Sequence, residues 1–163
     1  NFKHVSYDAG FLWLIAENGS IIKCAYQMPC VTVPGKLRQL DAGSGEVYGV
    51  SDDDKVFFWH SNRWAQIAGN YSHVTVGPAG VWAVNRQNFV YRLQDFAWMH
   101  VSGLLKQIDA GGDTFLAGVN AADNIYCLNQ GTGSQRLQGS LAMVEVGTDG
   151  SVFAVNTQGK VFR

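Results

Sequence analysis

The chain has 163 residues, of which 47% are hydrophobic and 15% charged, and its formal net charge is −1 at pH 7. This balance fits one domain, or one array of small units, with a buried core, and it excludes a disordered tail. The small net charge disfavours a nucleic-acid binder with a basic surface, and no apolar run approaches the roughly 18 residues of a membrane helix. The 19 glycines, 5 tryptophans, 6 tyrosines and 9 phenylalanines favour short strands and tight turns over a helical bundle.

One pattern recurs along the whole chain. Four copies begin with a glycine, and their leading glycines, separated by 34, 34 and 36 residues, are Gly35, Gly69, Gly103 and Gly139. A fifth copy begins at the N-terminus, where residues 2–7 match residues 105–110 and Asp8 replaces the second glycine of the other copies. The pattern divides one domain, 1–163, into repeats of about 1–32, 33–67, 68–101, 102–137 and 138–163.

The predicted elements follow the same order in each repeat. Apolar strands are expected at 12–15, 47–50, 81–84, 116–119 and 152–155. Each is followed by a polar turn that ends in a residue tolerating positive φ: Gly19, Asp54, Asn88, Asp123 and Gly159. Second strands are expected at 21–22, 56–58, 90–91, 125–126 and 161–162, and two repeats add a Trp-containing strand at 64–69 and 98–103. We therefore predict an all-β protein, a β-propeller of about five small blades with about four strands per repeat.

Three short motifs add a family resemblance to this pattern. They are Leu-Lys-Gln-Ile-Asp-Ala-Gly at 105–111, Ala-Gly-Val-Asn at 117–120 and Asn-Ile-Tyr-Cys at 124–127. They resemble a tectonin repeat, and over all five copies the chain resembles the fish-egg lectins and the tachylectin-1 type lectins. The resemblance implies a secreted, extracellular lectin of innate defence in eggs or body fluids. Its ligands would be N-acetylglucosamine-type glycans or bacterial lipopolysaccharide.

The chain departs from the family pattern in its number of repeats. Fish-egg lectins resemble six-bladed rings, whereas five copies are found here, and the last stops at Phe162 and Arg163 before a Trp-containing strand. The first copy resembles the C-terminal blade of family members. The chain is therefore expected to be either a fragment of a longer ring or a permuted or shortened five-bladed form.

The cysteines bear on the compartment of the protein. In the lectins that the chain resembles, a disulfide joins the two chain ends at a position like that of Cys24 and Cys30. The resemblance thus implies a Cys24–Cys30 bridge that pins one blade to the next; two reduced cysteines in a turn are the alternative. Cys127 is expected to be a small core residue.

The sequence holds no catalytic motif. His4 and His73 share a repeat position with Gln39 and Gln107, which favours a structural hydrogen-bonding role over that of a general base. Neither a Gly-x-Ser-x-Gly elbow nor a phosphate-binding glycine loop is present. We therefore predict a protein that is not an enzyme and requires no cofactor.

Sugar binding needs an exposed aromatic face and planar amide or carboxylate groups. The candidate groups are Trp64 with Asn62 and Gln66, Trp98 with His100, and Tyr71 with Asn70. A tryptophan that recurs once per blade is equally consistent with packing between blades.

Two further columns of residues recur. Ser6, Asp41, Thr75, Asp109 and Glu145 share one position on the strand expected to line the central channel. The carboxylates of Asp41, Asp109 and Glu145 either face water there or gather a cation such as Ca²⁺. Asn85, Asn120 and Asn156 end the second strand, where asparagine is expected to cap the turn.

Taken together, the sequence and the resemblance predict a secreted, non-enzymatic lectin. Its partners would be glycans rather than nucleic acid, and a homo-oligomer is compatible with this interpretation. The alternative is a protein-interaction propeller, in which the same blade rims hold a partner protein or peptide.

Overall fold

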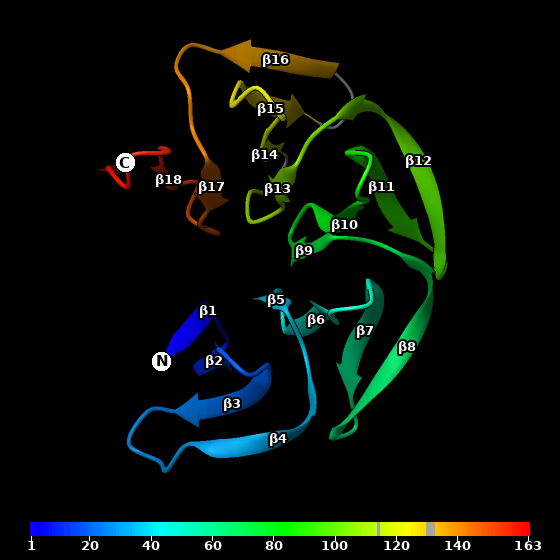
Figure 1. The fold of residues 1–163 in the computed structure, drawn as a ribbon, viewed down its shortest axis with the longest axis vertical. Helices are drawn as coiled ribbons and strands as arrows, with labels where there is room; N and C mark the ends of the chain where they lie inside the picture. The colour runs from blue at the N-terminus through cyan, green and yellow to red at the C-terminus, as the bar shows by residue number, and fades with distance from the viewer. Residues whose placement is uncertain (114, 130–132) are drawn as a thin grey trace.

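The structure is a computed structural model that describes residues 1–113, 115–129 and 133–163. In that part of the chain, 19 β-strands form five antiparallel sheets, which are arranged as blades around a central channel (Figure 1). Each sheet is a meander, because strands that follow one another in the sequence are hydrogen bonded side by side. The predicted all-β propeller of five small blades is confirmed.

The first blade contains β1 (Phe2–Asp8), β2 (Phe11–Ala16), β3 (Ser20–Ala25) and β4 (Val31–Lys36). The second contains β5 (Gln39–Gly43), β6 (Glu46–Val50), β7 (Lys55–His60) and β8 (Arg63–Asn70). The third contains β9 (His73–Gly77), β10 (Gly80–Val84), β11 (Phe89–Gln94) and β12 (Ala97–Leu104). The fourth contains β13 (Gln107–Asp109), β14 (Phe115–Val119), β15 (Ile125–Asn129) and β16 (Gly133–Leu137). The fifth has three described strands, β17 (Met143–Val146), β18 (Val152–Val155) and β19 (Val161–Phe162).

The turns between the second and third strands form as the sequence predicts. Asp54, Asn88 and Asp123 have φ values of 65°, 67° and 62°, and Gly19 and Gly159 have 83° and 76°. Asn85 caps its turn, because its Oδ1 accepts hydrogen bonds from the Gln87 and Phe89 amides at 3.0 and 2.9 Å. Asn120 and Asn156 accept equivalent pairs of backbone hydrogen bonds, so the predicted capping role is confirmed.

The hydrophobic core is divided among the junctions between blades. One cluster joins Trp13 and Ile21 of the first blade to Leu40 of the second, and another joins Val50 and Val56 of the second to Val74 of the third. Two more clusters fill the next two junctions. A blade therefore buries its apolar side chains against its neighbours, and an isolated blade would expose them.

The cysteines lie differently from the expectation. Cys24 and Cys30 form a disulfide, as the resemblance implied. The bridge closes the turn between β3 and β4, which pair in the same sheet, so it staples one blade rather than joining two. This happens because β4 extends past the repeat boundary predicted near residue 32. Cys127 is free and half-buried on β15.

The inner strands of successive blades approach closely at glycines. A Cβ on Gly43, Gly77 or Gly111 would collide with a backbone carbonyl oxygen of the next blade, that of Val76, Ala110 or Val146 respectively. A Cβ on Gly147 of the fifth blade would meet its own hairpin, with Asp149 Oδ1 at 2.8 Å.

The ring is open between the fifth and the first blade. The inner strands β1, β5, β9, β13 and β17 pack in series, but in the described part of the chain no comparable packing joins β17 to β1. Figure 1 shows β1 and β17 on either side of this opening. Val5 and Tyr7 on β1 are 58% and 67% exposed, whereas Ile108 and Ala110 at the same repeat positions are fully buried.

These contacts predict unequal effects for one substitution at two equivalent glycines. Gly77→Ala forces a methyl group into the third blade's junction with the fourth, so we expect it to lower the free energy of unfolding by about 3 kcal/mol. Gly147→Ala meets a side chain that can move and should cost well under 1 kcal/mol. Urea denaturation followed by tryptophan fluorescence measures both. Equal losses would show that the fifth blade packs against the first.

Candidate functional site

Side chains on the inner strands bind the backbone of the next blade. Gln39 Nε2 donates to the Val74 carbonyl at 2.8 Å, and its Oε1 accepts from the Val74 amide at 3.0 Å. Gln107 makes the same pair of bonds to Val144, at 2.7 and 3.0 Å. His4 and His73 use Nε2 to contact one carbonyl each. The predicted structural role of this His/Gln position is confirmed, and we call these contacts the inter-blade clip.

A second row of hydrogen bonds lies two residues further along each inner strand. Asp41 accepts from Ser6 Oγ at 3.0 Å, Thr75 Oγ1 at 2.8 Å and the Val76 amide at 2.9 Å. Asp109 accepts from Thr75 Oγ1 at 3.0 Å and the Val146 amide at 2.6 Å. Thr75 has a single hydroxyl hydrogen, so it donates to one of the two carboxylates at a time.

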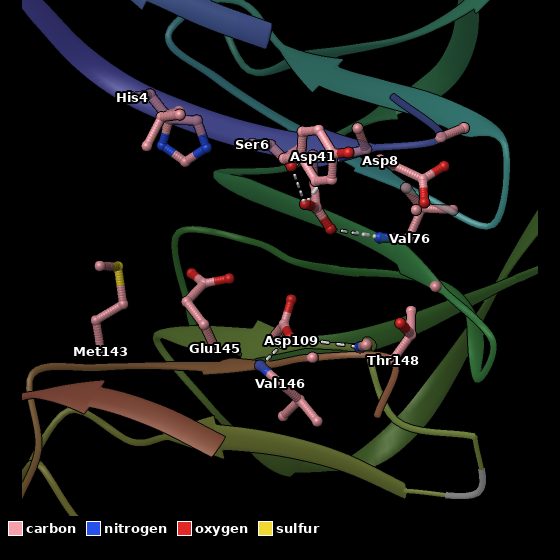
Figure 2. Close-up of a pocket in the computed structure, with 18 of the residues that line it drawn as sticks. His4, Ser6, Asp8, Asp41, Val76, Asp109, Met143, Glu145, Val146 and Thr148 are labelled. Carbon is pink, nitrogen blue, oxygen red and sulfur yellow. Dashed lines mark hydrogen bonds between the residues drawn. The ribbon is translucent and has the colours of Figure 1, made fainter. Parts of the chain in front are cut away.

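The carboxylates line a central cavity of about 770 Å³. Figure 2 shows Glu145 pointing into this cavity, beside Asp109 and across from Asp41. Burial, and then the charge of Asp41, raises the pKa of Asp109 to about 6. Glu145 is exposed to the channel, where desolvation by its surroundings, followed by the charges of Asp109 and Asp41, raises its pKa above the usual range. The channel therefore disfavours additional negative charge.

Two of the three predicted calcium ligands, Asp41 and Asp109, are engaged in protein hydrogen bonds. Asp41 accepts on one oxygen from Ser6 Oγ and on the other from the Val76 amide, and Asp109 accepts from the Val146 amide. Thr75 Oγ1 adds a hydrogen bond to one of the two carboxylates at a time. Among residues 1–113, 115–129 and 133–163, no group of three or more His, Cys, Asp or Glu side chains is placed to hold a metal ion. Calcium binding by Asp41, Asp109 and Glu145 stays the alternative to a water-facing channel wall.

The two candidate tryptophans pack between blades. Trp64 lies against Gly35 of the first blade, and its ring is 5.0 Å from that of Trp59 and 6.2 Å from that of Trp13. Trp98 lies against Gly69 of the second blade and donates from Nε1 to the Ala68 carbonyl at 3.0 Å. Both rings are half-buried, so each keeps part of its surface open to solvent.

The other candidates lie in different settings. Gln66 is exposed on the same face of β8 as Trp64, and His100 is exposed on the same face of β12 as Trp98. Asn62 is exposed in the β7–β8 turn with a φ of 58°. Asn70 is exposed and accepts from Lys55 Nζ at 2.6 Å. Tyr71 is only 7% exposed and belongs to the core between the second and third blades, so its ring offers little surface to a ligand.

A rim pocket that sequence analysis missed lies between the second and third blades. Its volume is about 500 Å³, and it is lined by Gly45, Glu46, Val47, Tyr48, Phe58, Trp59, His60 and Phe96. The Phe58 ring is 6.0 Å from that of Tyr48 and 6.2 Å from that of Phe96. These residues come from the β5–β6 turn, β6, β7 and the β11–β12 turn, so no single repeat contains them. The sequence feature that could have indicated this pocket is Phe96, a phenylalanine in a hairpin turn.

Five small meander blades joined through side chains around a channel define the protein as a small-blade β-propeller. The chain belongs to the tectonin family, because residues 36–136 match the tectonin domain. Fish-egg lectin from Cyprinus carpio is 34% identical over 188 aligned positions, which cover 83% of this chain and 79% of that protein. Since the alignment is longer than the 163-residue chain, the carp protein has residues with no counterpart here.

Other similarities are more local or concern the fold alone. Tectonin-1 from Physarum polycephalum is 34% identical over 53 residues, which are 32% of this chain and 24% of that protein. Human WBSCR16 superimposes with a TM-score of 0.75 at 11% identity, over 99% of this chain and 61% of that chain. In the part of the chain that the structure describes, no helix is long and apolar enough to span a membrane.

The clip predicts a pH effect at His73. Burial lowers the pKa of His73 to about 4 from 6.5, so between these values the unfolded chain binds a proton that the folded chain does not. Stability is therefore lost as the pH falls through this window. His73→Gln, which copies Gln39 and Gln107, should unfold at an unchanged temperature at pH 7.5 but be more stable than the parent at pH 4.5 by about 2 kcal/mol. Thermal unfolding at both pH values tests this, and equal pH slopes would contradict it.

The engaged carboxylates predict an outcome for metal removal. Because protein donors already satisfy Asp41 and Asp109, we expect excess EDTA to leave the melting temperature unchanged and CaCl₂ not to raise it. Differential scanning calorimetry of the chelated and the calcium-loaded protein measures this. A melting temperature that falls with EDTA and returns with CaCl₂ would instead establish the calcium site.

Proposed function

We propose that this protein is a secreted, non-enzymatic lectin that binds N-acetylglucosamine-type glycans or the glycans of bacterial lipopolysaccharide. The observation that carries the proposal is the 34% identity with a fish-egg lectin across 79% of that protein. A role in the innate defence of eggs or body fluids follows from the same kinship. The proposal requires no cofactor and no catalytic group.

The blade rims supply the chemistry that sugars need. Half-buried aromatic rings are fixed by packing and keep one part exposed, which suits the C–H face of a pyranose. Trp64 stands beside Gln66 on β8, and Trp98 stands beside His100 on β12, so a polar group accompanies each ring. Weak sites repeated around the ring would combine through avidity on a surface with many glycans.

The disulfide supports the extracellular part of the proposal. Disulfides persist in oxidising compartments and are rare where glutathione keeps thiols reduced. Cys24 and Cys30 form such a bridge in the first blade. The partners of this protein would then be glycans outside the cell rather than nucleic acid.

A protein-interaction propeller is the second candidate function, and the ring opening favours it. Val5 and Tyr7 on β1 are more than half exposed, although the residues at the same repeat positions in the other four blades are buried. Phe2 on the same strand is also exposed. An apolar strand of this kind suits a partner protein better than a sugar.

Isothermal titration with N-acetylglucosamine, its short oligomers and lipopolysaccharide tests the lectin proposal, with galactose as the comparison sugar. We expect saturable binding that is selective for the first group. Gln66→Ala removes an exposed amide without disturbing the packing of Trp64, and we expect several-fold weaker binding if the β8 rim takes sugar. Gln158→Ala, an exposed amide in a turn of the fifth blade, is the matched control.

The outcomes separate the two candidate functions. Loss in Gln66→Ala alone supports the lectin proposal and a site on β8. Equal binding in both variants keeps the lectin proposal and removes β8 as the site. A folded chain that binds none of these ligands contradicts the lectin proposal and favours the protein-interaction alternative.

A further inference from the structure

The turn between β11 and β12 is strained in an unusual way. Its two central residues, Asp95 and Phe96, have φ values of 49° and 60°. Two-residue hairpin turns of this conformation favour glycine at the second position, because a side chain is disfavoured at positive φ. The equivalent turn of the second blade has Asn62 there, which tolerates that conformation. Phenylalanine at this position costs roughly 1 kcal/mol or more.

Burial does not offset this cost. Phe96 is 72% exposed, so its ring gains little from the hydrophobic effect. The ring instead lies 6.2 Å from Phe58 of the second blade, at an angle of 51°. The strained turn therefore holds an exposed aromatic ring at the edge of the rim pocket between two blades.

The pocket combines this ring with polar groups. Its aromatic walls are Tyr48, Phe58 and Phe96, and its polar groups include Glu46 and His60. The His60 ring is 6.1 Å from that of Phe58, so it belongs to the same aromatic group. Burial, and then the charge of Glu46, raises the pKa of Tyr48 to about 12, which keeps its hydroxyl protonated. A volume of about 500 Å³ is within the usual range of small-ligand sites.

We propose that this rim pocket is a monosaccharide site that takes a neutral terminal pyranose. Phe96 and Phe58 contact the C–H face of the sugar, and Glu46 and His60 bind its hydroxyl groups. The carboxylate of Glu46 accepts hydrogen bonds from hydroxyls and repels an acidic sugar, so the ligand class is neutral hexoses and N-acetylhexosamines. This inference rests on the proposed lectin function, because it assigns one site for that function.

Replacing Phe96 by glycine separates stability from binding. Phe96→Gly creates an Asp-Gly turn, which suits this conformation, so we expect the melting temperature to rise by about 2–4 °C. The same change removes the aromatic contact, so we expect the affinity for N-acetylglucosamine to fall at least tenfold. Phe96→Tyr keeps the ring and should keep the affinity. Tyr26→Ala removes an aromatic that is 86% exposed in the disulfide loop and should change neither property.

Amide chemical shifts place the site independently of affinity. In a ¹⁵N-labelled chain titrated with N-acetylglucosamine, we expect shifts at residues 45–48, 58–60 and 95–96. Shifts confined to β8 or β12 would overturn the rim-pocket site and leave the lectin function intact. The same holds if Phe96→Gly binds N-acetylglucosamine as tightly as the parent chain does. A lower melting temperature in Phe96→Gly would overturn the strain argument.

Different experimental results would contradict the proposed lectin function and the rim-pocket site. If the parent chain is folded but binds neither a neutral sugar nor lipopolysaccharide, the lectin proposal and the site are both wrong. If the parent chain and Tyr26→Ala bind N-acetylglucosamine and Phe96→Gly does not, the lectin proposal and the rim-pocket site are both supported. N-acetylneuraminic acid is the acidic control sugar, and binding as tight as that of N-acetylglucosamine would contradict the assigned ligand class.

Discussion

The fold depends on the inter-blade clip, in which a side chain of one inner strand binds the backbone of the next blade. Inner strands of different blades do not form a β-ladder with one another, so buried backbone groups near the channel need other partners. Gln39 and Gln107 supply both a donor and an acceptor to one residue of the neighbouring blade. His73 supplies a single contact, to the Ile108 carbonyl. Leaving such a buried group without a partner would cost about 1–3 kcal/mol, so the clip restricts which residues this position accepts.

The opening of the ring coincides with a change in the clip residues. The fifth blade has Met143 at the His/Gln position and Glu145 at the position of Asp109. A methionine side chain cannot donate a hydrogen bond, and Glu145 points into the cavity (Figure 2), whereas Asp109 accepts from the Val146 amide. The first blade, which would receive these contacts, leaves Tyr7 exposed to solvent. The channel electrostatics follow from the same change, because Glu145 has its carboxyl in the cavity beside two aspartates.

The sequence was sufficient for the features that repeat and insufficient for those that do not. The period and the positive-φ turns at residues such as Asp54 recur in every blade, and the capping by Asn85 recurs in the fourth and fifth blades, so repetition itself identified them. The disulfide was placed in the wrong context, because the sequence does not show that β4 belongs to the first sheet. The burial of Tyr71 could not be predicted from the sequence, because its neighbour Asn70 is exposed and the repeat pattern does not distinguish the two settings. The rim pocket needs two blades to be brought together, and no periodicity contains that information.

This division between repeated and unrepeated features bears on where ligands bind. Positions that maintain the ring, such as Gln39 and Gly77, are constrained by contacts with the next blade and have little freedom to acquire a ligand. The recurring Trp64 and Trp98 fall partly in this class, since both pack on a glycine of the preceding blade. Phe96 is different, because its backbone is strained and its phenyl ring is exposed. Packing of the blades into a propeller explains neither property. Backbone strain that no stabilising contact offsets is expected at functional sites. The residues most informative about binding in such a propeller are therefore those at which one blade departs from the others.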